Sequence, residues 1–234
     1  MTATTLHGLP LPVLAPAGPA RRRRILIWAV LGTVAFFLVP NLVMVGVSAL
    51  ARRGAPAAPD VVGVKNFAEV DDRLWRGAAP GRVGYRSLAD HGVTTVIDLR
   101  AEDYIRVDEA ELADLGITRI HLPLRDGQSP GPELVERFLA IVRDAPGRVF
   151  LHCGAGVGRT GTLAAAYLVS TGQASGSEAV RRNLQVGPPS LEQVAFSAQL
   201  DGRRVHRPAT AVVAMSRVLD APRRIWVNVR RSYR

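Results

Sequence analysis

The pattern of hydrophobic and polar positions divides the chain of 234 residues into a long apolar segment followed by shorter alternating elements. Residues 25–51 contain no charged side chain, and arginines flank them at residues 21–24 and 52–53. This run exceeds the roughly 20 apolar residues that a helix needs to cross a bilayer. Pro40 lies inside it and is expected to kink such a helix, which membrane helices tolerate. The pattern therefore predicts a transmembrane helix over residues 21–53, including its basic flanks.

Two other interpretations fit the apolar segment less well. A buried core helix is rarely apolar on all sides. A cleavable signal peptide has an apolar region of about 7–15 residues, although Ala49-Leu50-Ala51 does fit a small-x-small cleavage site. The four arginines before the segment, against Arg52, Arg53 and Lys65 after it, favour a cytoplasmic N-terminus. We expect an uncleaved single-pass anchor in the cell membrane through residues 25–51, with the following domain outside the cytoplasm.

Beyond residue 64, apolar strands alternate with helical patterns. Three segments have the β-branched and apolar composition of buried strands: residues 93–99, 117–124 and 148–153. Residues 66–77 are expected to add two short strands at one edge. Helices are expected at about 106–115, at 132–144, at 160–170, at 177–184 and at 190–200. This alternation predicts an α/β domain over residues 64–200, with a central, mainly parallel sheet flanked by helices.

The remaining segments are predicted to lie outside this domain. Residues 1–20, rich in Pro, Ala and Thr, are expected to form a disordered tail, and residues 54–63 a linker. Residues 201–234 form a basic C-terminal tail that mixes arginines with apolar residues. Trp226 and Tyr233 would suit a membrane interface, and a solvated tail fits equally well. A basic tail also suits a cytoplasmic membrane surface, which opposes the orientation given above.

Charge and cysteine content exclude several classes of protein. The formal net charge is +10, but residues 61–200 carry 15 basic and 17 acidic side chains, so the excess lies in the flanks. Because nucleic-acid binding needs a basic face on the folded domain, we predict no nucleic-acid partner. The single cysteine, Cys153, excludes an internal disulfide framework and a Cys-rich zinc site. We expect neither a metal nor another cofactor.

Cys153 lies in the segment LHCGAGVGRTG, residues 151–161, between a predicted strand and a predicted helix. The glycines allow backbone N–H groups to converge, and the helix adds its N-terminus, so the loop can hold an anion. The same field favours the thiolate form of a cysteine. Arg159 can bind two phosphate oxygens through its planar guanidinium, and the Thr160 hydroxyl can donate to the sulfur. The pattern is typical of a cysteine that attacks a bound phosphate.

This segment resembles the signature H-C-x-x-G-x-x-R-[ST]-G of cysteine-dependent protein tyrosine phosphatases, including their dual-specificity and bacterial branch. All fixed positions match: His152, Cys153, Gly156, Arg159, Thr160 and Gly161. The resemblance implies a protein tyrosine phosphatase-like fold. It also implies catalytic roles for Cys153, Arg159, His152 and Thr160, and phosphate binding by Arg159 with the loop Gly154, Ala155, Gly156, Val157 and Gly158. The likeness extends over about residues 64–200.

The resemblance further implies a general acid, an aspartate on a loop upstream of the cysteine. Asp126 is the only acidic residue of LPLRDGQSPG, which lies between a predicted strand and a predicted helix. A solvated turn aspartate is the alternative interpretation, and Asp103 and Asp108 are weaker candidates because a further strand follows them. The segment NLQVGPPSLEQVAF places Gln193 where the family carries a glutamine near the active site, so Gln193 is a secondary candidate that positions water.

Three functions are compatible with these features. The first is a membrane-anchored phosphatase acting on phosphotyrosine, with phosphoserine and phosphothreonine as further substrates. The second is a phosphatase of phospholipids or other small phosphomonoesters at the membrane. The family resemblance implies lysines in the loop of relatives that recognise polyphosphorylated inositols, and none lies between Cys153 and Arg159, which argues against highly charged head groups but not against simple phosphatidyl phosphates. The third, a phosphate-binding module without activity, is disfavoured because a nucleophile, an arginine and an acid are all present.

Overall fold

The computed structural model describes residues 19–55, 61–101, 109–202 and 205–222 of the chain. The chain divides into two compact units, residues 1–39 and 40–234. The expected disordered tail at residues 1–20 lies almost wholly outside the described residues, as do Asp103, Asp108, Trp226, Tyr233 and most of the expected linker.

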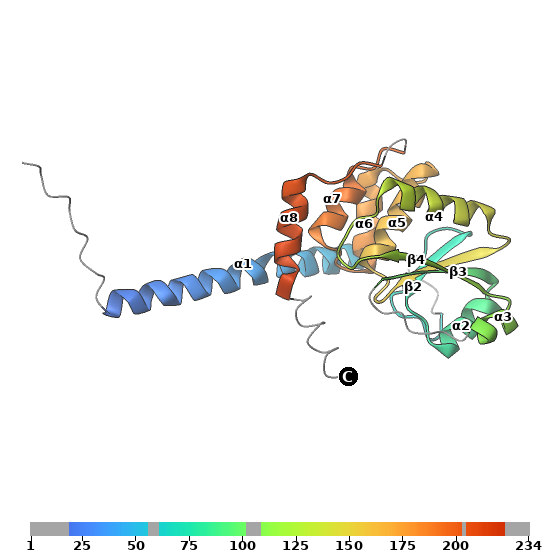
Figure 1. Ribbon diagram of the computed structural model, residues 1–234, viewed down its shortest axis with the longest axis horizontal. Coiled ribbons are helices and arrows are strands. Elements are labelled where there is room, and N and C mark those ends of the chain that lie inside the picture. The colour runs from blue at the N-terminus through green and yellow to red at the C-terminus, as the bar shows by residue number, and fades with distance from the viewer. Residues whose placement is uncertain (1–18, 56–60, 102–108, 203–204, 223–234) are drawn as a thin grey trace, which may run out of the picture. The chain divides into compact units, whose positions relative to one another are not determined.

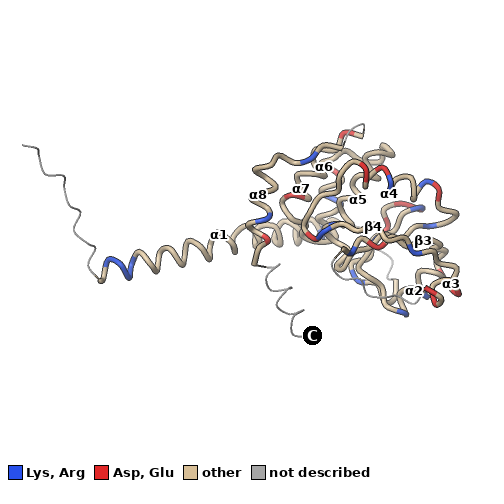
Figure 2. The backbone as a smooth tube through the Cα atoms, viewed as in Figure 1, with Lys and Arg blue, Asp and Glu red and all other residues tan. Residues whose placement is uncertain are grey.

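The apolar segment forms one long helix, α1 (Pro19–Arg53), with Pro40 inside it (Figure 1). Its most apolar part has a mean hydropathy of 2.2, and none of that part is buried, so length and composition suit a membrane span. A signal sequence near an N-terminus has the same properties. Figure 2 shows the run of basic residues at the beginning of α1, whereas basic and acidic residues are interspersed over the folded domain.

The sheet has five strands in the order β1-β2-β5-β3-β4. The strands are β1 (Ala68–Glu69), β2 (Leu74–Ala78), β3 (Val93–Arg100), β4 (Thr118–Leu124) and β5 (Arg148–Cys153). Only the short edge strand β1 is antiparallel to its neighbour; the other pairs are parallel. The predicted α/β class with a mainly parallel sheet is therefore confirmed, including the two short strands at one edge.

Alternating side chains of the strands supply two separate hydrophobic clusters, one on each face of the sheet. Leu74, Ile97 and Leu151 belong to the cluster packed with helices α4 to α7, whereas Trp75, Val96 and Phe150 belong to the cluster packed with α2 and α3. Figure 1 shows the two groups of helices on opposite sides of the sheet. The helices are α2 (Arg82–Asp90), α3 (Glu109–Asp114), α4 (Pro132–Asp144), α5 (Gly158–Ser170), α6 (Gly176–Val186) and α7 (Leu191–Ala198).

Two helices were not predicted from the hydrophobic pattern. Helix α2 is short and contains Gly84, which lowers helical propensity. That glycine is explained by packing, because a Cβ there would lie 2.8 Å from the carbonyl oxygen of Gly63. Helix α8 (Thr210–Leu219) lies within the expected basic tail and packs against α7. At least this part of the C-terminal segment is therefore folded onto the domain.

Candidate active site

The candidate site lies where the carboxyl ends of the parallel strands meet, the usual position of ligand sites in open α/β sheets. Strand β5 lies between β2 and β3 and ends at Cys153, and α5 begins at Gly158. Residues 154–157, here called the glycine loop, connect the two, so the predicted strand–loop–helix arrangement is present. The Cys153 side chain is 3% exposed, and its Sγ accepts a hydrogen bond from the backbone N–H of Gly156 at 3.3 Å.

The carbonyl groups of the glycine loop are all bound by neighbouring donors. The backbone N–H of Ala79 donates to Gly154 O at 3.3 Å, and Asn66 Nδ2 donates to Ala155 O at 2.9 Å. Arg76 Nη2 donates to the carbonyl oxygens of residues 156 and 157, at 2.8 and 3.1 Å. Because the C=O and N–H of a peptide point in opposite directions, the loop N–H groups point away from these donors, and that of Gly156 points to Cys153 Sγ. This geometry suits the anion cradle predicted from the sequence, which stays a prediction.

Gly156 makes the tight course of the loop possible. Its φ is 72°, in the left-handed region that favours glycine. A Cβ at this position would lie 2.2 Å from the carbonyl carbon of Gly77 in β2, so no larger residue fits without a backbone shift. The close approach of the glycine loop to β2 therefore depends on glycine at position 156.

The Arg159 side chain is fixed by the ends of two strands. Its Nη1 donates to Leu124 O at 3.0 Å and to Leu99 O at 3.4 Å, and the residue is only 6% exposed. Its Nε lies 3.4 Å from Asp126 Oδ1. These contacts hold the guanidinium beside the glycine loop, because a Cβ on Gly154 would lie 4.0 Å from Arg159 Nη2. From there two guanidinium nitrogens could bind the oxygens of a phosphate.

Asp126 lies in a turn at the start of residues 125–131, here called the aspartate loop, between β4 and α4. The backbone N–H of Gln128 donates to Arg125 O at 3.3 Å, and Gly127 has a φ of 75°, as turns with a left-handed third residue require. The Asp126 side chain is 41% exposed and forms the ion pair with Arg159. The structure therefore brings Arg159 and Asp126 together, and a Cβ on Gly154, the residue after Cys153, would lie 4.0 Å from Arg159 Nη2.

His152 and Thr160 lie behind the loop in the protein interior. Thr160 Oγ1 has no hydrogen-bond partner among the described residues, so the expected bond to Cys153 Sγ is not formed in this structure. His152 is fully buried, and its Nδ1 lies 3.3 Å from Cys153 O. Burial lowers the pKa of His152 to about 4, although the charge of Asp98 opposes this shift. The imidazole is therefore neutral at neutral pH.

Gln193 is buried rather than exposed, and it lies close to the start of α5, because a Cβ on Gly158 would be 2.4 Å from its Oε1. Its side chain completes the N-terminal capping box of α7: Oε1 accepts from the backbone N–H of Ser190 at 3.0 Å. Its Nε2 donates to Gln128 O in the aspartate loop at 3.3 Å. Both polar atoms are thus engaged in holding backbone, and the role in positioning water stays a prediction.

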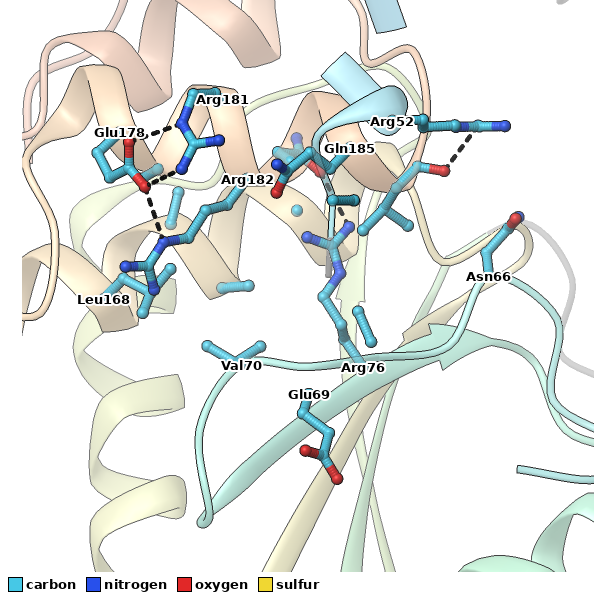
Figure 3. A pocket seen from close by; sticks show the side chains of 18 of the residues that line it. Arg52, Asn66, Glu69, Val70, Arg76, Leu168, Glu178, Arg181, Arg182 and Gln185 are labelled. Carbon is cyan, nitrogen blue, oxygen red and sulfur yellow. Dashed lines mark hydrogen bonds and ion pairs between the residues drawn. The ribbon is translucent and has the colours of Figure 1, made fainter. Parts of the chain in front are cut away.

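Arg76 is a functional candidate that the sequence analysis did not identify. It is 4% exposed, and besides the two loop carbonyls its Nη2 donates to Asn183 Oδ1 of α6 at 2.9 Å. Figure 3 shows its side chain directed from β2 toward α6, at the edge of a cavity of about 720 Å³. Among the described residues no carboxylate pairs with it. Burial lowers the pKa of Arg76 to about 10, while the charge of Cys153 opposes the shift, so Arg76 stays protonated at neutral pH.

Comparisons with known proteins place this geometry in a family. Residues 59–199 match the family model described as "DSP-PTPase phosphatase fused to NAD+ Kinase". The dual specificity protein phosphatase CDC14C of human is 36% identical over 105 residues, which cover 42% of this chain and 23% of the human protein. The probable NAD kinase 2, chloroplastic, of rice is 33% identical over 102 residues, which cover 41% of this chain and 10% of the rice protein. This chain thus spans less than a quarter of either relative.

Two solved structures share the fold at low sequence identity. The core catalytic domain of the PP-IP phosphatase SIW14 from S. cerevisiae, in complex with citrate, has a TM-score of 0.54 and 19% identity, covering 62% of this chain and 91% of that chain. PTPMT1 in complex with PI(5)P has a TM-score of 0.50 and 19% identity, covering 63% of this chain and 97% of that chain. These likenesses confirm the expected protein tyrosine phosphatase-like fold.

Proposed function

The chain belongs to the DSP-PTPase family of cysteine-dependent phosphatases, and from this premise we propose that it hydrolyses phosphotyrosine, with phosphoserine and phosphothreonine as further substrates. The proposal is supported by three observations: the backbone N–H of Gly156 donates to Cys153 Sγ, Arg159 Nη2 would lie 4.0 Å from a Cβ on Gly154, and Asp126 lies 3.4 Å from Arg159. The named dual-specificity relatives support the same class of substrate.

The proposed reaction has two displacements at phosphorus. In the first, the Cys153 thiolate attacks the phosphorus, the bond to the alcohol or phenol oxygen breaks, and Asp126 donates a proton to that oxygen. The glycine loop N–H groups and Arg159 hold the three phosphate oxygens throughout. In the second, a water molecule attacks the cysteinyl-phosphate, Asp126 takes its proton, the S–P bond breaks, and inorganic phosphate leaves with Cys153 again a thiolate.

The test of this proposal is a substrate panel on the full chain purified in detergent. Phosphotyrosine, phosphoserine and phosphothreonine peptides are compared, with EDTA present throughout. We expect hydrolysis of the phosphotyrosine peptide by the natural chain and none by Cys153→Ser, which keeps the size of the side chain but not its nucleophilicity. Activity that survives Cys153→Ser, or that needs a divalent ion, contradicts the proposal.

A second candidate function is hydrolysis of phospholipids or other small phosphomonoesters at the membrane. The apolar helix α1 favours a substrate near the bilayer, and PTPMT1, a protein of this fold, has been crystallised with PI(5)P. Phosphatidyl phosphates in mixed micelles belong in the same panel. A kcat/KM for such a lipid well above that for every phosphopeptide would favour this second function.

We also propose that α1 anchors the protein in the cell membrane with the domain outside the cytoplasm, because residues 21–24 are all arginine. Protease added to intact spheroplasts should then digest the domain. A domain that is protected until the membrane is broken contradicts the orientation. Release of a soluble domain that begins near Arg52 would show instead that Ala49-Leu50-Ala51 is a cleavage site. Replacement of residues 21–24 by neutral residues should weaken or invert the orientation.

A further inference from the structure

The backbone of the aspartate loop is held by three polar side chains from the start of α7. Ser190 Oγ donates to Gly127 O at 2.9 Å, and Gln193 Nε2 donates to Gln128 O at 3.3 Å. Glu192 Oε1 accepts two hydrogen bonds from Ser129, one from its backbone N–H and one from its Oγ, both at 2.9 Å. Each of the three residues that follow Asp126 is therefore bound by a side chain of the same helix terminus.

Glu192, the acidic side chain of this set, is buried, and helix α8 supports it in turn. The residue is 4% exposed. Its backbone N–H donates to Ser216 Oγ of α8 at 3.1 Å, and Arg217 Nε of α8 lies 3.9 Å from its other carboxylate oxygen. Ser216 is 1% exposed, so α8 covers this contact from solvent. The chain of contacts therefore runs from α8 through Glu192 to Ser129, three residues from Asp126.

This chain of contacts includes a segment outside the family match. The family model covers residues 59–199, whereas α8 begins at Thr210. Within the aspartate loop itself, the turn bond from Gln128 to Arg125 is 3.3 Å long, and the Asp126 side chain is 41% exposed. A general acid must reach its proton acceptor within about 2.6–3.2 Å. Because the aspartate loop has only this long turn hydrogen bond within it, contacts from other elements are needed to hold the Asp126 carboxyl within this distance of a substrate oxygen.

We propose that Glu192, supported by Ser216 of α8, is a positioning residue that holds Asp126 in place for proton transfer. This inference rests on the proposed phosphatase function and on Asp126 as its acid. It assigns a role to α8, which lies beyond the residues 59–199 that the family model matches. The hydrogen bonds of Glu192 go to Ser129 and Ser216, so its effect should be confined to the step that needs the proton.

The experiment measures kcat/KM of the full chain for phenyl phosphate, a poor leaving group, and for p-nitrophenyl phosphate, a good one. Glu192→Ala removes Oε1, the acceptor of both hydrogen bonds from Ser129. It should lower the ratio of kcat/KM for phenyl phosphate to kcat/KM for p-nitrophenyl phosphate about tenfold or more, because small misplacements of a catalytic group are this costly. Glu192→Gln keeps one oxygen at the same place and should recover part of the ratio. Ser216→Ala should lower the ratio less, and Met215→Ala, at an exposed position of α8, should leave it unchanged.

A double variant separates positioning from general destabilisation. In an Asp126→Asn background, Glu192→Ala should change the ratio no further, because the acid through which it acts is gone. Equal losses on both substrates, or a further loss of the ratio in the Asp126→Asn background, would overturn the inference. If Glu192→Ala does not fold, Ser216→Ala decides alone, and an unchanged ratio overturns it. Cys153→Ser separates the two proposals, because residual activity there contradicts the phosphatase function itself.

Discussion

The glycine loop and the aspartate loop meet at Arg159 but are held by different parts of the chain. The glycine loop is fixed through its carbonyl groups by donors in and around β2, namely Asn66, Arg76 and the backbone of Ala79. The aspartate loop is fixed by side chains of α7, which α8 supports from behind. The first set of contacts lies wholly within residues 59–199, the span of the family match, whereas the second extends beyond it.

This difference has a functional meaning under the proposed mechanism. The glycine loop must bind the phosphate in both displacements, so any change in its support should affect all substrates alike. The aspartate loop serves proton transfer, and its importance depends on how readily the alcohol or phenol leaves without a proton. Variants of the two loops should therefore be separable by the leaving-group dependence of their kinetics.

Arg159→Lys should have the largest effect that all substrates share, because Arg159 serves both loops. A lysine cannot form two parallel bonds to a phosphate, and it cannot at once bind Leu124 O and Leu99 O and approach Asp126. We expect kcat/KM to fall by roughly 10²–10³-fold on every substrate, the size seen when one preorganised donor is removed from a transition state. Arg143→Lys, at an exposed position of α4, is the matched control. Comparable activity of the two variants would contradict the role of Arg159.

Asp126→Asn should come next and should depend on the substrate. The amide cannot donate an acidic proton, so we expect a loss of roughly 10²–10⁴-fold in kcat for phenyl phosphate and a much smaller loss for p-nitrophenyl phosphate. Asp114→Asn, at the exposed end of α3, is the control. Equal losses on the two substrates would indicate that Asp126 supports the structure of the loop rather than the transfer of a proton.

Arg76→Met should have a smaller effect that does not depend on the leaving group. The substitution leaves two buried acceptors, Gly156 O and Asn183 Oδ1, without this donor, whereas Val157 O keeps the backbone N–H of Gly161. Lost hydrogen bonds to a charged group are each worth roughly 1.5–3 kcal/mol, so we expect kcat/KM to fall about 10–100-fold on both substrates and phosphate to inhibit less. Arg76→Lys should recover part of the loss, and Arg86→Met, at an exposed position of α2, should cause none. A loss confined to phenyl phosphate would contradict the proposed difference between the loops.

The features of the fold and the site that could be predicted are those that depend on residues close together in the sequence. The apolar runs located three strands, and the fixed spacing from Cys153 to Arg159 indicated an anion loop before a helix. The supports of the two loops were not predicted, because Arg76 meets the carbonyl of Gly156 across 80 residues and Ser216 meets Glu192 across 24. One available signal was an arginine inside the otherwise apolar strand LWRGA, where a charge must find buried partners. Nothing local in the tail indicated that α8 packs on α7.

His152→Gln should have the smallest effect. It should change the pH dependence of the free energy of unfolding rather than catalysis, and it concerns only the glycine loop. Its folded pKa is about 4, below the roughly 6.5 of an unfolded histidine. As the pH falls from 6.5 toward 4, the unfolded chain takes up a proton that the folded chain does not, so stability present above pH 6.5 is progressively lost. Between pH 6.5 and pH 5 this amounts to ~1.5 kcal/mol of unfolding free energy. Denaturant titrations at the two pH values should show this loss in the natural chain and a reduced loss in His152→Gln. The same loss in both proteins would show that another group titrates, and that the base of the glycine loop does not depend on a neutral imidazole.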